Sequence, residues 1–164
     1  MTRDRRLYRF QSTWVLGAVI DDVFEVLVHP GEARVPNILE SKVTATGRAN
    51  GVGRTAVYRV RSPLLYSLQF EAVIVDVEAP TMLRSEVSGD LEGAGTYRLS
   101  SQPDGTRVDF GWLVRTTKRW MNVLAPVARP VFAWAHYRVM RTLVEAMAAE
   151  LEAEIKSFDS QLVD

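Results

Sequence analysis

The last third of the chain, residues 120–158, carries apolar side chains at intervals of three and four residues. This spacing is typical of one long helix with a broad apolar stripe. Because a run of short alternating strands precedes it, we expect the helix to lie in the concave side of an antiparallel sheet. His136, one of only two histidines, falls within the stripe. The sequence therefore predicts a sheet that encloses a helix, with a cavity between them.

Length and charge set the broad class of the protein. Its 164 residues fit a single domain, residues 1–164, with a sizeable core. The 20 Lys and Arg residues balance the 20 Asp and Glu residues, and this zero net charge argues against nucleic acid as a partner. The absence of cysteine excludes disulfides, thiolate metal sites and a cysteine nucleophile. Since neither a signal-peptide pattern nor an apolar run of ~18 residues is present, we expect a cytoplasmic protein.

The N-terminal part of the chain predicts one strand and two short helices. Apolar and polar residues alternate over residues 8–16, which indicates a strand with one buried face. Residues 23–28 have apolar side chains at helical spacing, and His29-Pro30-Gly31 ends this first short helix. A second short turn of helix is expected at residues 32–37, where Pro36 limits its length.

Alternating patterns predict six further strands, which lie at residues 41–46, 55–61, 66–74, 82–88, 91–101 and 107–114. Turn sequences such as Gly89-Asp90 and Pro103-Asp104-Gly105 separate them, which indicates an antiparallel meander. We expect the first strand of the chain to pair beside the last strand of this meander.

Two details of the sheet depend on single residues. The strand predicted at residues 82–88 can pair in two registers. We favour the register that buries Leu83, Ser85 and Val87, because the other one buries Arg84 and Glu86. Gly93 and Gly95 lie inside a predicted strand, where glycines usually mark a bulge or a sharp bend.

The order of these elements predicts an α+β fold in which a curved seven-stranded antiparallel sheet wraps around a long C-terminal helix, with two short helices after the first strand. Pro126 and Pro130 each lack an N–H and crowd the preceding turn. They predict a start, kink or break between Met121 and Val131, followed by an unbroken helix to about Lys156.

Four short segments carry a resemblance to a known family: Gly51-Val52-Gly53, residues 89–93, residues 105–108, and Trp134-Ala135-His136 with Met140. In this order of elements, the chain resembles the START-like (SRPBCC) superfamily over essentially its whole length, in particular the polyketide cyclase/dehydrase and lipid-transport branch. The resemblance implies the helix-grip fold and a cavity that holds a hydrophobic small molecule. Ala135 stands where relatives often have asparagine, so a polar network built on that asparagine is absent or rebuilt.

The candidate ligand-binding residues come from the helix stripe and from the strand faces. His136 can be a core histidine bonded to a neighbouring strand or a hydrogen-bonding group of the cavity wall, and both interpretations stay open. Large residues on the strand faces line the cavity in a helix-grip fold. The candidates are His136, Tyr58, Phe70, Tyr97, Trp112, Phe132, Val139, Met140 and Leu143.

The sequence identifies no catalytic residue, metal site or cofactor site. His29 is the only other histidine, and no carboxylate lies one turn from His136. No serine lies in a nucleophile elbow, and residues 47–53 lack the lysine of a phosphate-binding loop.

Two functions fit these observations. The first is binding of a lipid, a polyketide-like molecule or an aromatic molecule; the alternative is a cyclase/dehydrase-type enzyme that uses the same cavity. We favour binding, because a cyclase needs several polar groups that converge on its substrate. Residues 120–137, with Lys118, Arg119 and Arg129 nearby, could contact a membrane surface, but packing into the sheet explains the same apolar pattern more simply. The pattern carries no signal for an oligomeric state.

Overall fold

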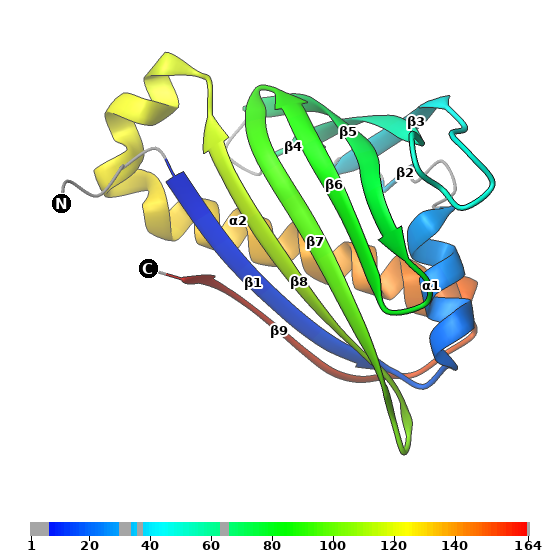
Figure 1. Ribbon diagram of the computed structural model, residues 1–164. Coiled ribbons are helices and arrows are strands. Elements are labelled where there is room, and N and C mark those ends of the chain that lie inside the picture. The colour runs from blue at the N-terminus through cyan, green and yellow to red at the C-terminus, as the bar shows by residue number, and fades with distance from the viewer. Residues whose placement is uncertain (1–6, 30–33, 36–37, 63–65, 164) are drawn as a thin grey trace, which may run out of the picture.

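The computed structural model describes residues 7–29, 34–35, 38–62 and 66–163, which form one curved sheet around a long helix (Figure 1). The strands are β1 (Leu7–Leu16), β2 (Arg34–Val35), β3 (Leu39–Ala45), β4 (Thr55–Arg61), β5 (Ser67–Glu78), β6 (Met82–Gly89), β7 (Leu91–Gln102), β8 (Gly105–Thr116) and β9 (Ile155–Val163). The helices are α1 (Ile20–Val28) and α2 (Arg119–Glu150). The predicted α+β class, a long helix held by an antiparallel sheet, is confirmed.

All neighbouring strands are antiparallel, in the order β2-β3-β4-β5-β6-β7-β8-β1-β9. As predicted, β1 lies beside the last strand of the meander, β8, with Phe10 opposite Trp112. Within the described ranges the sheet has nine strands, whereas the sequence predicts seven. The two additional strands, β2 and β9, lie at the two edges of the sheet.

The C-terminal helix ends earlier than predicted. The periodicity predicts a helix to about Lys156, but α2 ends at Glu150, and the N–H of the next residue, Leu151, bonds to the carbonyl of Met147. Glu152 then adopts a positive φ of 50°, which redirects the chain. The predicted last turns are therefore wrong, and these residues enter a strand instead.

That strand, β9, pairs with the outer edge of β1 and satisfies backbone groups that would otherwise have no partner. Phe158 lies opposite Trp14, and Leu162 lies opposite Phe10. Because Phe158 and Leu162 are four residues apart, their spacing fits both one face of a helix and one face of a strand. Tertiary pairing with β1 decides between the two.

Of the two predicted short helices, only the first is confirmed. The first is present as α1, which buries one apolar face. The second, at residues 32–37, is wrong where the structure describes it, because Arg34 and Val35 form β2 and pair with β3. The remaining residues of that prediction lie outside the described part of the chain. Pairing supplies partners for the backbone at the edge of β3, which a single turn of helix would not do.

Burial decides the register of β6, and strand pairing decides the role of the two glycines in β7. The favoured register of β6 is confirmed, since Leu83 and Val87 are both buried. Gly93 and Gly95 do not mark a bulge, because β7 pairs with β6 and β8 through both residues without a shift in register. Gly95 instead allows a close approach: a Cβ atom there would lie 2.8 Å from Cε3 of Trp112.

α2 runs as one continuous helix, but its first turns point in a different direction from the rest (Figure 1, yellow against orange). Pro126 and Pro130 lie in this stretch, and the change of direction agrees with the predicted kink. The helix contacts β1, β8 and β9. No helix among the described residues is long and apolar enough to span a bilayer.

Candidate functional site

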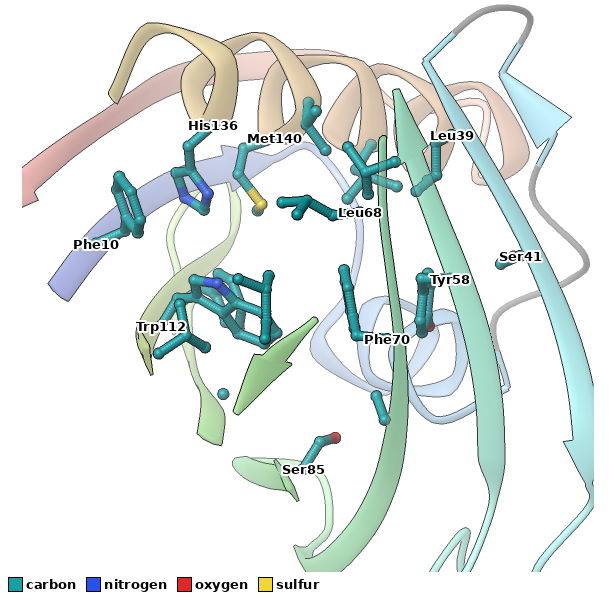
Figure 2. A pocket seen from close by; sticks show the side chains of 18 of the residues that line it. Phe10, Leu39, Ser41, Tyr58, Leu68, Phe70, Ser85, Trp112, His136 and Met140 are labelled. Carbon is teal, nitrogen blue, oxygen red and sulfur yellow. The ribbon is translucent and has the colours of Figure 1, made fainter. Parts of the chain in front are cut away.

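A cavity of about 620 Å³ lies between the sheet and α2 (Figure 2). Its lining is mostly apolar and comes from both helices and from seven strands, β1 and β3 to β8. A volume of this size is typical of pockets that enclose a drug-sized molecule. All nine candidate residues from the sequence lie in its wall: Tyr58, Phe70, Tyr97, Trp112, Phe132, His136, Val139, Met140 and Leu143.

One side of the cavity is a continuous row of aromatic rings, which we call the aromatic wall: Tyr58, Phe70, Trp112, Phe110 and Tyr97. The rings of Tyr58 and Phe70 stack with centroids 5.4 Å apart. Trp112 lies 5.9 Å from Phe70 and 5.6 Å from Phe110, which in turn stacks on Tyr97 at 4.2 Å. These residues come from β4, β5, β7 and β8, so the strand pairing holds the wall in place.

A second group of rings lies at the end of the cavity near the bend in α2. Phe132 contacts Tyr8 at 5.6 Å and Tyr66 at 6.0 Å between ring centroids, both edge to face. Tyr8 stacks beside Phe10 at 6.2 Å, and Phe10 stacks on His136. The cavity is therefore bounded by aromatic rings on two sides, and such rings favour flat apolar ligands.

His136 projects from α2 toward the cavity, next to Phe10 (Figure 2). Its Nε2 atom is buried and has no hydrogen-bond partner within the described ranges. Among the described residues, this atom therefore lacks the bond to a neighbouring strand that a core histidine would make. Burial lowers the pKa of His136 from 6.5 to about 3, so the imidazole is neutral at pH 7. A neutral ring offers one donor and one acceptor.

Tyrosine hydroxyls are among the other polar groups of the interior. The Tyr8 hydroxyl is buried and has no hydrogen-bond partner in the described part of the protein. Burial raises the pKa of Tyr97, and the neighbouring Tyr58 adds to this effect. Burial also raises the pKa of Tyr58, against the opposing charge of Arg54. These phenols therefore remain protonated at neutral pH and can donate hydrogen bonds.

The cavity wall reaches solvent at four exposed residues of β4 and α2. Arg61, Arg138, Ala146 and Glu150 line the cavity and are also exposed. The wall at these residues is therefore more polar than the interior, as expected where charged heads remain in water and aliphatic stems cover the apolar wall.

Most lining residues were not among the sequence candidates, and Phe10, Leu68 and Phe110 are examples. The signal for Phe10 and Phe110 was available, because Phe110 shares its parity with Trp112 and Phe10 shares its parity with Trp14. No group of three or more His, Cys, Asp or Glu residues that could hold a metal ion occurs among the residues that the structure describes.

No protein-family model matches the sequence, and no curated protein sequence is detectably similar. Solved structures are similar in fold. A conserved protein from Geobacillus kaustophilus superposes with a TM-score of 0.70 at 9% identity, over 93% of this chain and 99% of that one. The di-domain ARO/CYC BexL of the BE-7585A biosynthetic pathway gives a TM-score of 0.69 at 16% identity, over 92% of this chain.

A second di-domain ARO/CYC, StfQ of the steffimycin biosynthetic pathway, gives a TM-score of 0.64 at 14% identity, over 90% of this chain. This chain covers 52% of BexL and 52% of StfQ, so it corresponds to about half of each di-domain protein. At these identities the similarity concerns the fold alone. The protein therefore has a helix-grip fold similar to those of these solved structures.

Proposed function

We propose that the protein binds a hydrophobic small molecule in the cavity between the sheet and α2. The observation that carries this proposal is an apolar cavity of about 620 Å³ bounded by aromatic rings. Burial of apolar area contributes roughly 25 cal/mol per Å², whereas one neutral hydrogen bond contributes about 1 kcal/mol. Apolar contacts should therefore dominate affinity, and polar groups should set the orientation of the ligand.

The ligand that fits this wall is a lipid-like, polyketide-like or aromatic molecule with one polar end. Tyr58, Phe70, Tyr97 and Trp112 supply flat contacts from the strands. Phe132, Val139, Met140 and Leu143 supply contacts from α2. His136 lies among the latter and is the group that would bond to a hydroxyl or carbonyl of the ligand.

The alternative is a cyclase/dehydrase-type enzyme that uses the same cavity, which the two ARO/CYC structural neighbours favour. A general base works best when its pKa is near the working pH. The pKa of His136, about 3, makes its imidazole a weak base. For this reason we place binding before catalysis.

Titration with the neutral fluorophore N-phenyl-1-naphthylamine tests the proposal. The wild-type protein should enhance its fluorescence saturably, and Leu143→Arg should abolish the enhancement by placing a charge in the cavity. The matched control is Leu113→Arg, at a leucine that is 38% exposed and does not line the cavity. Circular dichroism checks that both variants fold. Absence of binding by the wild type, or equal binding by folded Leu143→Arg, would contradict the proposal.

Native mass spectrometry of the protein purified from its own host would identify the molecule. A co-purified apolar compound that displaces the fluorophore would support binding. Incubation of that compound with the protein then separates the two functions, because a binding protein returns it unchanged and a cyclase returns a product of altered structure.

A further inference from the structure

The first turns of α2 expose an apolar face to solvent. Trp120, Val123, Leu124 and Val127 are 43%, 78%, 51% and 82% exposed, respectively. Their spacing places them on one side of the helix, and we call them the exposed α2 face. Met121, on the other side, is 3% exposed and lines the cavity. Packing into the sheet, which the sequence favoured as the explanation of this apolar pattern, therefore accounts for the inner side only.

The stretch of sequence that carries this face has charges of one sign. Residues 111–144 include six Lys or Arg residues and no Asp or Glu. Part of this charge is compensated by ion pairs, such as that of Lys118 with Asp90 at 3.3 Å. Arg119 and Arg138 are exposed and form no ion pair with any residue that the structure describes. An apolar helix face is thus flanked by positive charge.

We propose that the exposed α2 face docks on the surface of an anionic phospholipid bilayer. Its apolar side chains would enter the boundary between headgroups and acyl chains, and the nearby cations would attract the lipid phosphates. Trp120 and Trp134, both partly exposed, are of the residue type enriched at this boundary. A symmetric contact with a second copy is disfavoured, because it would bring two positively charged surfaces together.

The exposed α2 face lies directly outside one end of the cavity. The ring of Trp120 contacts that of Tyr66 at 5.4 Å, and Tyr66 contacts Phe132 at 6.0 Å between centroids. Tyr66 and Phe132 both line the cavity. Docking would hold this end of the cavity against the lipid phase, in which apolar molecules accumulate. This role in ligand exchange rests on the proposed function, whereas the docking itself does not.

Vesicle flotation with the full chain tests the docking. Phosphatidylcholine vesicles with added phosphatidylglycerol should bind the wild type, and salt should weaken this binding. Val127→Glu should lower the partition coefficient about tenfold or more, because it places a negative charge in the buried contact. The matched control is Val19→Glu, at a valine that is 63% exposed at the start of α1. It should leave the partition coefficient unchanged.

Arg119→Glu gives a second readout of the same contact. It should weaken binding to vesicles that contain phosphatidylglycerol and have little effect on residual binding to pure phosphatidylcholine. The proposal is overturned if the wild type does not float with anionic vesicles, or if Val19→Glu and Val127→Glu reduce flotation equally. It is also overturned if light scattering shows a dimer that Val127→Glu dissociates while flotation is unchanged.

Fluorophore titration of Val127→Glu without vesicles separates this inference from the proposed function. Val127 does not line the cavity, so the affinity of this variant for the fluorophore should equal that of the wild type. A protein that floats but binds no fluorophore would contradict the ligand cavity and leave the docking supported. A protein that binds fluorophore but does not float would contradict only the docking.

Discussion

The ring of His136 stacks on that of Phe10, with centroids 4.0 Å apart and planes inclined by 19°. This contact fixes the plane of the imidazole, while its Nε2 remains buried without a hydrogen-bond partner among the described residues. A buried polar group without a partner costs about 1–3 kcal/mol. A ligand that bonds to His136 would remove this cost, so under the proposed function the histidine would be a selective contact in a mostly apolar cavity.

The first prediction follows from this geometry. His136→Phe should retain binding of 1-methylnaphthalene and weaken binding of 1-naphthol about fivefold relative to it, because one neutral hydrogen bond contributes about 1 kcal/mol. Displacement of the fluorophore by each compound gives the two affinities. If the variant leaves their ratio unchanged, His136 is only a packing residue.

The second prediction concerns acid stability. Because burial lowers the pKa of His136 to about 3, the unfolded chain binds a proton at a higher pH than the folded protein. The neutral histidine therefore contributes to the free energy of unfolding. This contribution is fully present above the pKa of the unfolded histidine, about 6.5, and is lost as the pH falls toward 3. Between pH 7 and pH 4 the loss should be about 3 kcal/mol.

Urea denaturation at the two pH values measures this loss. His136→Phe should reduce the difference in unfolding free energy between pH 7 and pH 4 relative to the wild type, since phenylalanine takes up no proton. Equal pH dependence of the wild type and His136→Phe would contradict a buried neutral His136.

Strand parity explains why part of the cavity wall was predictable. Side chains two residues apart share one face of a strand, so Tyr58, Phe70, Tyr97 and Trp112 could be assigned to the concave face before their contacts were known. The helical stripe located Phe132, Val139, Met140 and Leu143 on the facing helix in the same way.

Periodicity did not determine which segments fill the edges of the sheet. The spacing of Phe158 and Leu162 fits both a helix and a strand. They lie in a strand, β9, because this segment pairs with the edge of β1. Packing was favoured over surface contact for residues 120–137 for a related reason: spacing reveals apolar sides of a helix, but not whether a sheet covers each of them. Both decisions depend on contacts between residues that are distant in the sequence.

The third prediction concerns Gly95, which the aromatic wall requires. A Cβ atom at this position would lie 2.8 Å from Cε3 of Trp112 and 3.0 Å from Cε2 of Phe110. Gly95→Ala should therefore displace these rings into the cavity, lower the affinity for the fluorophore and reduce the unfolding free energy by about 1–3 kcal/mol. Gly111→Ala is the control, because the nearest atom to its Cβ, Oε1 of Gln11, is 3.7 Å away. Similar effects of the two variants would argue against this packing role.

The last prediction concerns the contact that holds α2 to the edge of the sheet. The ring of Phe158 in β9 meets that of Tyr137 edge to face, with centroids 5.2 Å apart. The guanidinium of Arg141 lies 5.5 Å from the centroid of the Phe158 ring. Because Phe158 is only partly buried, Phe158→Ala should reduce the unfolding free energy by about 2 kcal/mol, less than at a core phenylalanine. Amide exchange along α2 should become faster, because the helix loses part of its attachment. Gln161→Ala, at an exposed position of β9, should change neither quantity. If Phe158→Ala unfolds in urea like Gln161→Ala, then β9 contributes backbone pairing to β1 but does not anchor the helix.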